Sequence, residues 1–187
     1  MDISAYGSGK AKNTDIEELI ERLSKGDTDA LEELYSATSD GVFAYALSIL
    51  RSIPDAEDAM QDTYLKIAST AHRYIPQGKP MAWILTCAKN MCLMKLRERK
   101  RRAETPIEGN PDALKSDDDG LSRIEDALMI EASMKELSPE ENSIVVLHAV
   151  AGLKHRETAK LMGMPLSTVL SKYRRALEKL RKHITLE

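Results

Sequence analysis

The stretch "GMPLSTVLSKYRR", residues 163–175, joins a Gly-Pro break directly to the start of a basic helix. A tight turn between two helices favours a residue that accepts left-handed dihedral angles, and Gly163 does so without steric cost. Ala159 offers a small side chain where the two helices would approach each other. Val169, six residues after Gly163, offers an apolar side chain that would hold the second helix against the first. This spacing predicts a helix-turn-helix, a motif whose second helix enters the major groove of DNA.

The predicted second helix has two faces of different chemistry. Apolar residues recur on one side at helical spacing, as Val169, Tyr173, Ala176, Leu177, Leu180 and Ile184. The other side carries the residues that we expect to contact DNA, namely Ser167, Thr168, Ser171, Lys172, Arg174 and Arg175. The alternative is a plain hairpin of two helices whose basic side is merely solvated, and the motif alone leaves that alternative open.

The composition of the 187-residue chain predicts an all-α protein. Aromatic residues make up only 4%, and nine Gly and seven Pro leave few breaks between long runs rich in Ala, Leu, Lys and Glu. No apolar run approaches the length of a membrane span, and the opening "MDISAYGSGKAKN" lacks the apolar core of a signal peptide. We therefore expect a cytoplasmic protein whose residues 1–13 form a disordered tail.

The charges are segregated along the chain. Residues 14–62 carry 13 acidic side chains against three basic ones, whereas residues 63–102 carry ten basic side chains against Glu98 alone. Basic blocks of this kind favour a polyanionic partner. The cluster from Arg97 to Arg102 is a second basic surface, in addition to that of the C-terminal helix. Two such surfaces favour DNA binding over two solvated faces.

Two further helices are predicted in the N-terminal half. One begins near Pro54, and its "PDAEDAMQDTYLKIAS" places Ala56, Ala59, Met60, Tyr64 and Ile67 on one inward stripe. The opposite side is an acidic outer face made of Asp55, Asp58, Gln61, Asp62 and Leu65. The other helix, "MAWILTCAKNMCLMKLRERKRR", runs into the basic cluster.

The segment that starts "AETPIEGNPDALKSDDDG" has too little apolar content to offset the entropy of ordering it. We therefore expect a flexible linker at residues 103–122 between two small helical domains, 14–102 and 123–187. Cys87 and Cys92 lie five residues apart and face different sides of a helix, which favours core thiols over a disulfide. The sequence shows no metal-ligand set, catalytic triad or phosphate loop, so we expect no metal, no cofactor and no enzymatic activity.

Taken together, these segments resemble a bacterial RNA polymerase sigma factor of the extracytoplasmic-function (ECF) group. "DAEDAMQDTYLKI" is similar to region 2.2 of that family, and "MAWILTCAKNMCLMKLRERKRR" is similar to region 2.4. "LSPEENSIVVLHAVAGLKHRETAKLMGMPLSTVLSKYRRALEKLR" resembles region 4 from end to end. The resemblance covers residues 14–102 and 123–184, and two ordered motifs around a linker are more specific than either motif alone.

The resemblance implies roles for the segregated charges. The acidic outer face would dock on the clamp helices of the largest subunit of core RNA polymerase, and region 4 would dock on the polymerase flap. The loop from Arg73 to Pro80 and the basic helix would face the −10 promoter element, through Arg73, Lys89, Asn90, Arg97, Arg99, Lys100 and Arg101. The recognition helix would read the −35 element, and an anti-sigma factor is the partner usual in the family. Bond-making would belong to the core polymerase.

This sequence departs from the family pattern at three places. Leu170 stands where a basic residue is usual, Pro165 stands near a common capping serine, and Met94 stands where an aspartate often precedes the Leu-Arg pair. We therefore assign no base contacts to these positions, and we interpret Trp83 as a core residue. Two alternatives remain: a helix-turn-helix regulator that never docks on polymerase, and a helical adaptor whose basic runs are only solvated.

Overall fold

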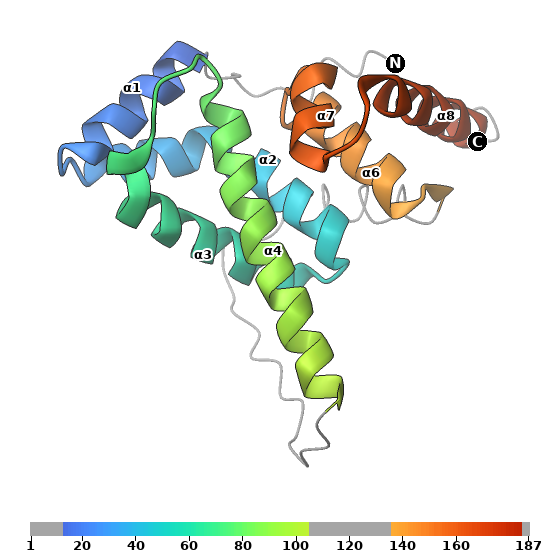
Figure 1. Cartoon of the computed structure of the whole chain (residues 1–187), viewed down its shortest axis with the longest axis horizontal. Helices are drawn as coiled ribbons and strands as arrows, with labels where there is room; N and C mark the ends of the chain where they lie inside the picture. The colour runs from blue at the N-terminus through green and yellow to red at the C-terminus, as the bar shows by residue number, and fades with distance from the viewer. Residues whose placement is uncertain (1–12, 105–135, 185–187) are drawn as a thin grey trace.

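The computed structural model describes residues 13–104 and 136–184, and every element in those ranges is helical (Figure 1). The N-terminal elements are α1 (Asn13–Ser24), α2 (Asp29–Leu50), α3 (Ile53–Thr70), the short 3₁₀ helix η2 (Ala71–Arg73) and α4 (Pro80–Glu104). The C-terminal elements are α6 (Pro139–Val145), a π-helical stretch η3 (Val146–Val150), α7 (His155–Met162) and α8 (Leu166–Ile184). The all-α prediction is confirmed.

Local signals in the sequence set several helix ends. Ser138 caps α6, because its hydroxyl accepts the N–H of Glu141 and the Glu141 carboxylate accepts the N–H of Ser138. The chain leaves α1 through Gly26, whose φ is 93°. Ser52 caps α3, and Pro54 lies in its first turn. The predicted tail up to residue 12 and the predicted linker from residue 105 onward lie outside the described residues.

Helix α2 is the centre of the fold. It packs against α1, α3, α4, α6 and η3, and its residues from Gly41 to Ser48 are buried without interruption. The part of α2 from Gly41 to Ser48 is thus enclosed by other elements, whereas the first half of the helix exposes Glu32, Glu33 and Asp40. The α3 stripe predicted from the sequence is buried against this core in full, as Ala56, Ala59, Met60, Tyr64 and Ile67.

The C-terminal helices pack on the N-terminal bundle. Val146, Leu147, Leu153 and Leu161 belong to the same buried cluster as the core of α1–α4. A Cβ atom on Gly41 of α2 would lie 3.3 Å from the Cα of Ala151, so the glycine permits this close approach. Figure 1 shows α7 beside the first turns of α4, while the last turns of α4 project beyond the other helices.

Candidate nucleic-acid interface

The turn between α7 and α8 has the geometry that the Gly163 spacing predicts. Gly163 has a φ of 69°, in the left-handed region, and its N–H bonds to the carbonyl of Lys160. The N–H of Met164 bonds to the carbonyl of Ala159, which completes a Schellman motif. Ala159 and Val169 are buried together with Ile144 of α6 in one small cluster. The predicted helix-turn-helix is therefore confirmed, and Ala159 and Val169 pack in the same cluster between its two helices.

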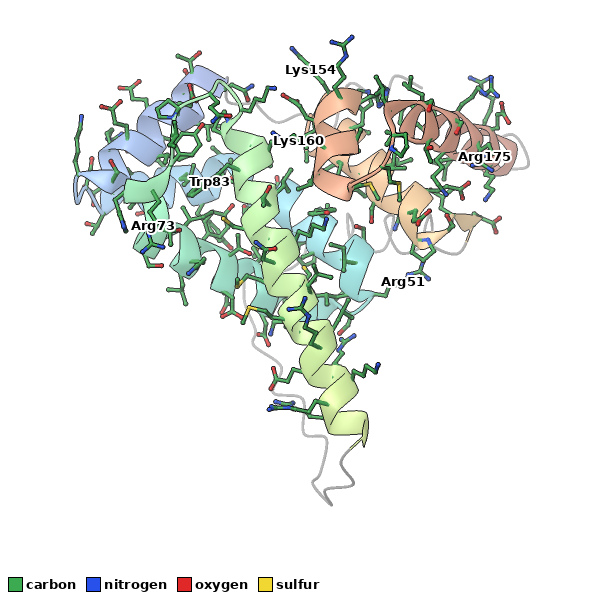
Figure 2. All side chains as sticks on the ribbon, in the orientation of Figure 1. Arg51, Arg73, Trp83, Lys154, Lys160 and Arg175 are labelled. Atoms are coloured by element: carbon green, nitrogen blue, oxygen red, sulfur yellow. The ribbon has the colours of Figure 1, made fainter. Side chains whose placement is uncertain are left out.

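The outward face of α8 exposes most of the residues expected to contact DNA. Ser167, Ser171, Arg174 and Arg175 are exposed, and Thr168 and Lys172 are half-buried. Figure 2 labels Arg175 on α8, at the end of the molecule farther from α1 and α3. Arg174 is 79% exposed and meets Glu178 only at 3.8 Å. Such a pair in solvent is weak, so Arg174 can exchange Glu178 for a phosphate at little cost.

Two bases of α8 serve the packing of the C-terminal helices. Lys172 forms an ion pair of 2.6 Å with Glu140, and its side chain is only 21% exposed. Lys179 reaches the buried carboxylate of Glu141 at 2.7 Å. Burial opposes the charge on Glu141, but the bonds from Lys179 and Ser138 lower its pKa overall. Of the predicted −35 residues, Lys172 is thus the one already engaged with another helix.

An aromatic cluster behind the recognition helix has no counterpart in the sequence predictions. The rings of His148 and His155 stack with their centroids 4.0 Å apart, and Tyr173 of α8 contacts both rings. Nδ1 of His148 lies 2.7 Å from the carbonyl oxygen of Leu153. The two histidines are seven residues apart, a spacing that would share a helix face, but the chain turns between them. The cluster fixes the end of η3 against α7 and α8.

The predicted DNA-contacting residues of α4 differ in their exposure and in their contacts. Asn90, Arg97, Lys100 and Arg101 are exposed, as is Arg73 in η2, which Figure 2 places on the far side of the molecule from Arg175. Arg99 is paired with Asp55 and donates to the carbonyl of Leu50. The ammonium of Lys89 donates to the carbonyl of Leu161 in α7, at 2.7 Å. Lys89 therefore joins the two halves of the chain in this structure.

The acidic face of α3 is on the surface, as predicted. Gln61 and Asp62 are exposed, and Leu65 exposes 68% of its surface. Lys95 of α4 approaches Asp58 at 3.3 Å and Asp62 at 3.9 Å. Together with the pair between Asp55 and Arg99, these contacts neutralise part of the face from within the chain.

The three departures from the family pattern have distinct environments. The carbonyl of Pro165 accepts the N–H groups of Thr168 and Val169, so it begins the bonding of α8 without a capping side chain. Leu170 and Met94 are 45% and 57% exposed. Trp83, expected in the core, is half-buried against the core cluster and its ring lies 5.0 Å from that of Tyr74.

The two cysteines are free thiols, as predicted. Cys92 is buried, which raises its pKa to about 12, and burial also raises the pKa of Cys87. High thiol pKa values leave little reactive thiolate at neutral pH. Among residues 13–104 and 136–184, no group of three or more metal-ligating side chains is found, and no helix there is long and apolar enough to cross a membrane.

Comparison with known proteins decides the family. Residues 34–102 match the family described as Sigma-70 region 2, and residues 127–180 match Sigma-70, region 4. The ECF RNA polymerase sigma factor BldN of Streptomyces coelicolor is 28% identical over 151 residues, which cover 78% of this chain and 57% of BldN. The chain belongs to the ECF sigma factors. It spans little more than half the length of BldN.

The fold of this sigma factor is also found in solved structures. CnrH, in a complex with the cytosolic domain of CnrY, has a TM-score of 0.63 at 20% identity, over 91% of this chain and 97% of CnrH. The sigma factor RpoE, in a complex with the anti-sigma factor NepR from Bartonella quintana, has a TM-score of 0.58 at 22% identity, over 78% of this chain and 91% of RpoE. The alternative of a helix-turn-helix regulator that never docks on polymerase is not favoured, because residues 34–102 match Sigma-70 region 2.

Proposed function

We propose that this ECF sigma factor binds core RNA polymerase through α3 and reads promoters through α8, α4 and the loop before α4. The protein directs the polymerase to promoters and starts transcription there, and the chemistry of RNA synthesis belongs to the core enzyme. Its place of action is then the cytoplasm, with the polymerase. The main support for the proposal is the outward basic face of α8, which follows the turn of the helix-turn-helix at Gly163. The same chain also matches region 2 and region 4.

For the −35 element, we assign the outward face of α8. Ser167, Thr168 and Ser171 offer hydroxyl groups near the first turns, where a recognition helix reaches base edges. Arg174 and Arg175 lie farther along and are exposed, which suits contacts with phosphates. Lys172 would have to leave Glu140 to join them.

For the −10 element, we assign Arg73, Asn90 and the exposed bases Arg97, Lys100 and Arg101. Arg99 belongs to the same surface but is tied to Asp55. Lys89 can reach DNA only after its ammonium group releases the carbonyl of Leu161 in α7. We infer that residues 14–102 and 123–187 act as separate units on the polymerase, joined by residues 103–122 as a tether.

For the polymerase, we assign Asp55, Asp58, Gln61, Asp62 and Leu65. An exposed apolar side chain beside several carboxylates suits a partner with an apolar pocket and a basic rim, such as the clamp helices. The flap would receive region 4. The structure of RpoE with NepR supports a further partner of the same class as NepR, an anti-sigma factor that competes for these surfaces.

The docking role of α3 is tested with the double variant Asp58→Lys/Asp62→Lys. Binding to core polymerase should weaken strongly, because the variant reverses two charges at the proposed contact and repels a basic partner. The control Glu18→Lys/Glu32→Lys makes the same change in net charge on exposed positions of α1 and α2 and should bind core normally. Normal core affinity in the α3 variant, at unchanged helicity, would remove this face from the proposal.

A further inference from the structure

One carboxylate of α1 holds the loop that precedes α4. Oε1 of Glu17 accepts three hydrogen bonds from this loop: from the hydroxyl of Tyr74 at 2.7 Å, from the N–H of Gly78 at 2.8 Å and from the N–H of Gln77 at 3.1 Å. The side chain of Asn13 adds a bond to the carbonyl of Gly78 at 3.2 Å. The loop at residues 74–79 is therefore fastened to α1 near both of its ends.

The loop presents an apolar side chain between these fastened points. Ile75 follows Tyr74 directly and is 70% exposed, the largest exposure among the big apolar residues of the described chain. Pro76 comes next and restricts the backbone of Ile75 to extended conformations. On the other side, the ring of Tyr74 packs on Trp83 of α4. Ile75 is thus held in solvent by neighbours that are themselves fixed.

We propose that Glu17 is a positioning residue that preorganises the loop, so that Ile75 enters between unstacked bases of the −10 element. Apolar side chains such as Ile and Pro serve as wedges between base steps in proteins that distort DNA. Arg73 and Lys79 flank the loop, are exposed and can hold the phosphates on either side of such a step. This inference rests on the proposed function and adds to it a residue on α1, outside the surfaces assigned above.

Preorganisation gives Glu17 an energetic role without contact with DNA. Fixing a backbone residue costs conformational entropy, and a loop that is already ordered does not bear that cost when DNA binds. A carboxylate suits this role better than an amide, because bonds to a charged acceptor are about twice as strong. The bond from Tyr74, followed by those from Gly78 and Gln77, lowers the pKa of Glu17 despite some burial, so it stays charged at neutral pH.

The first arm of the test follows the loop without DNA. Trp83 is the only tryptophan of the chain and contacts Tyr74, so its fluorescence reports on the loop. Glu17→Ala should change the emission of Trp83 and raise its quenching by acrylamide. Glu17→Gln keeps one acceptor oxygen and should restore part of the wild-type signal. Glu18→Ala, at the exposed neighbouring position, should leave the signal unchanged. Wild-type fluorescence in Glu17→Ala would contradict the proposal that Glu17 holds the loop.

The second arm measures promoter opening by holoenzyme assembled from core polymerase and the full chain. The probe is a promoter fragment mapped with the wild-type protein and carrying 2-aminopurine in the −10 element. Glu17→Ala should open it about tenfold more slowly, as an unordered loop must be fixed during binding. Ile75→Ala should have a similar effect, and the double variant should be little worse than Ile75→Ala, because both act through one contact.

The two arms separate this inference from the function on which it rests. Failure of the wild-type holoenzyme to open any promoter would contradict the proposed function itself. Normal opening by wild type and by Glu17→Ala alike, at equal core affinity, would leave that function intact and overturn the role of Glu17. If the double variant opened the promoter much more slowly than Ile75→Ala, Glu17 would act by another route. That result would contradict the proposal that Glu17 positions Ile75 between the bases.

Discussion

The α1–α4 bundle and the α6–α8 helix-turn-helix differ in where their apolar side chains are buried. The bundle has a continuous core of its own around α2. The C-terminal helices bury Ile144, Ala159 and Val169 among themselves, while Val146, Leu147, Leu153 and Leu161 belong to the core of the bundle. The α6–α8 region therefore depends on the α1–α4 bundle for much of its buried surface.

The two regions also differ in their buried polar groups. Among the described residues, the buried side-chain nitrogen and oxygen atoms without a hydrogen-bond partner belong to Asn142, His155 and Thr158, all in the C-terminal region. In the bundle, the buried hydroxyls of Thr38, Ser48 and Thr63 are all bonded. A buried polar atom without a partner costs about 1–3 kcal/mol. We therefore expect the C-terminal region to be the less stable of the two.

The largest effect should come from truncating the shared core. Leu147→Ala removes a fully buried side chain of η3 and should cost about 2–5 kcal/mol of unfolding free energy in the C-terminal region. The matched change Ile67→Ala does the same within the bundle. Denaturant unfolding followed by circular dichroism and by Trp83 fluorescence separates the regions. Leu147→Ala should shift the Trp83 transition much less than Ile67→Ala. Equal shifts would mean that the two regions unfold as one unit.

A change at the turn should affect the C-terminal region alone. Gly163→Val places a β-branched residue at a φ of 69° and should cost about 1–3 kcal/mol through backbone strain. The strain is purely conformational, because a Cβ at this position meets no atom within 4 Å. Gly163→Asn should cost less, since Asn tolerates left-handed dihedrals. Thermal unfolding and binding to −35 DNA measure the effect, and full binding by a stable Gly163→Val variant would contradict it.

A pair of isosteric changes tests the difference in polar satisfaction. Thr158 and Thr63 are both fully buried, but only Thr63 has a bonded hydroxyl, at 2.6 Å from the carbonyl of Ala59. Thr158→Val should therefore raise the free energy of unfolding by about 1 kcal/mol, and Thr63→Val should lower it by about 1 kcal/mol. Denaturant titration gives both values. Destabilisation of similar size in both variants would remove the distinction.

The smallest effect should be a pH dependence confined to the C-terminal region. Burial, with His148 as the lesser cause, lowers the pKa of His155 below its ordinary value. The unfolded chain then binds this proton more readily, so the free energy of unfolding should fall as pH drops below about 6.5 toward the folded pKa. His155→Phe should reduce this dependence. An unchanged pH profile in His155→Phe would exclude the effect.

Local patterns were enough to predict much of this molecule. The left-handed turn at Gly163, the α3 stripe and the packing of Ala159 with Val169 depend on residues close to each other in the sequence, where helix geometry sets the spacing. Leu177 is an exception, because it was placed on the inward stripe of α8 but is 36% exposed.

Contacts between distant segments left no local signal. Three hydrogen bonds join residues more than 60 positions apart. They are the bonds between Lys89 and Leu161, between Ser48 and Ser143, and between Glu17 and Gly78. The sequence therefore predicted which side chains are charged or apolar and on which helix face they lie. It could not predict that Asp55 and Arg99, assigned to different partners, form an ion pair with each other.

The central claim is that the outward face of α8 binds promoter DNA, and the salt dependence of that binding tests it most directly. Affinity for a mapped −35 element should be measured over a range of salt concentrations for wild type, for Arg174→Ala/Arg175→Ala and for the charge-matched control Lys25→Ala/Lys66→Ala. Each lost phosphate contact should reduce the slope of log affinity against log salt by about one unit. We therefore expect a loss of about two units for the α8 variant and none for the control. A folded α8 variant with wild-type affinity and slope would contradict it.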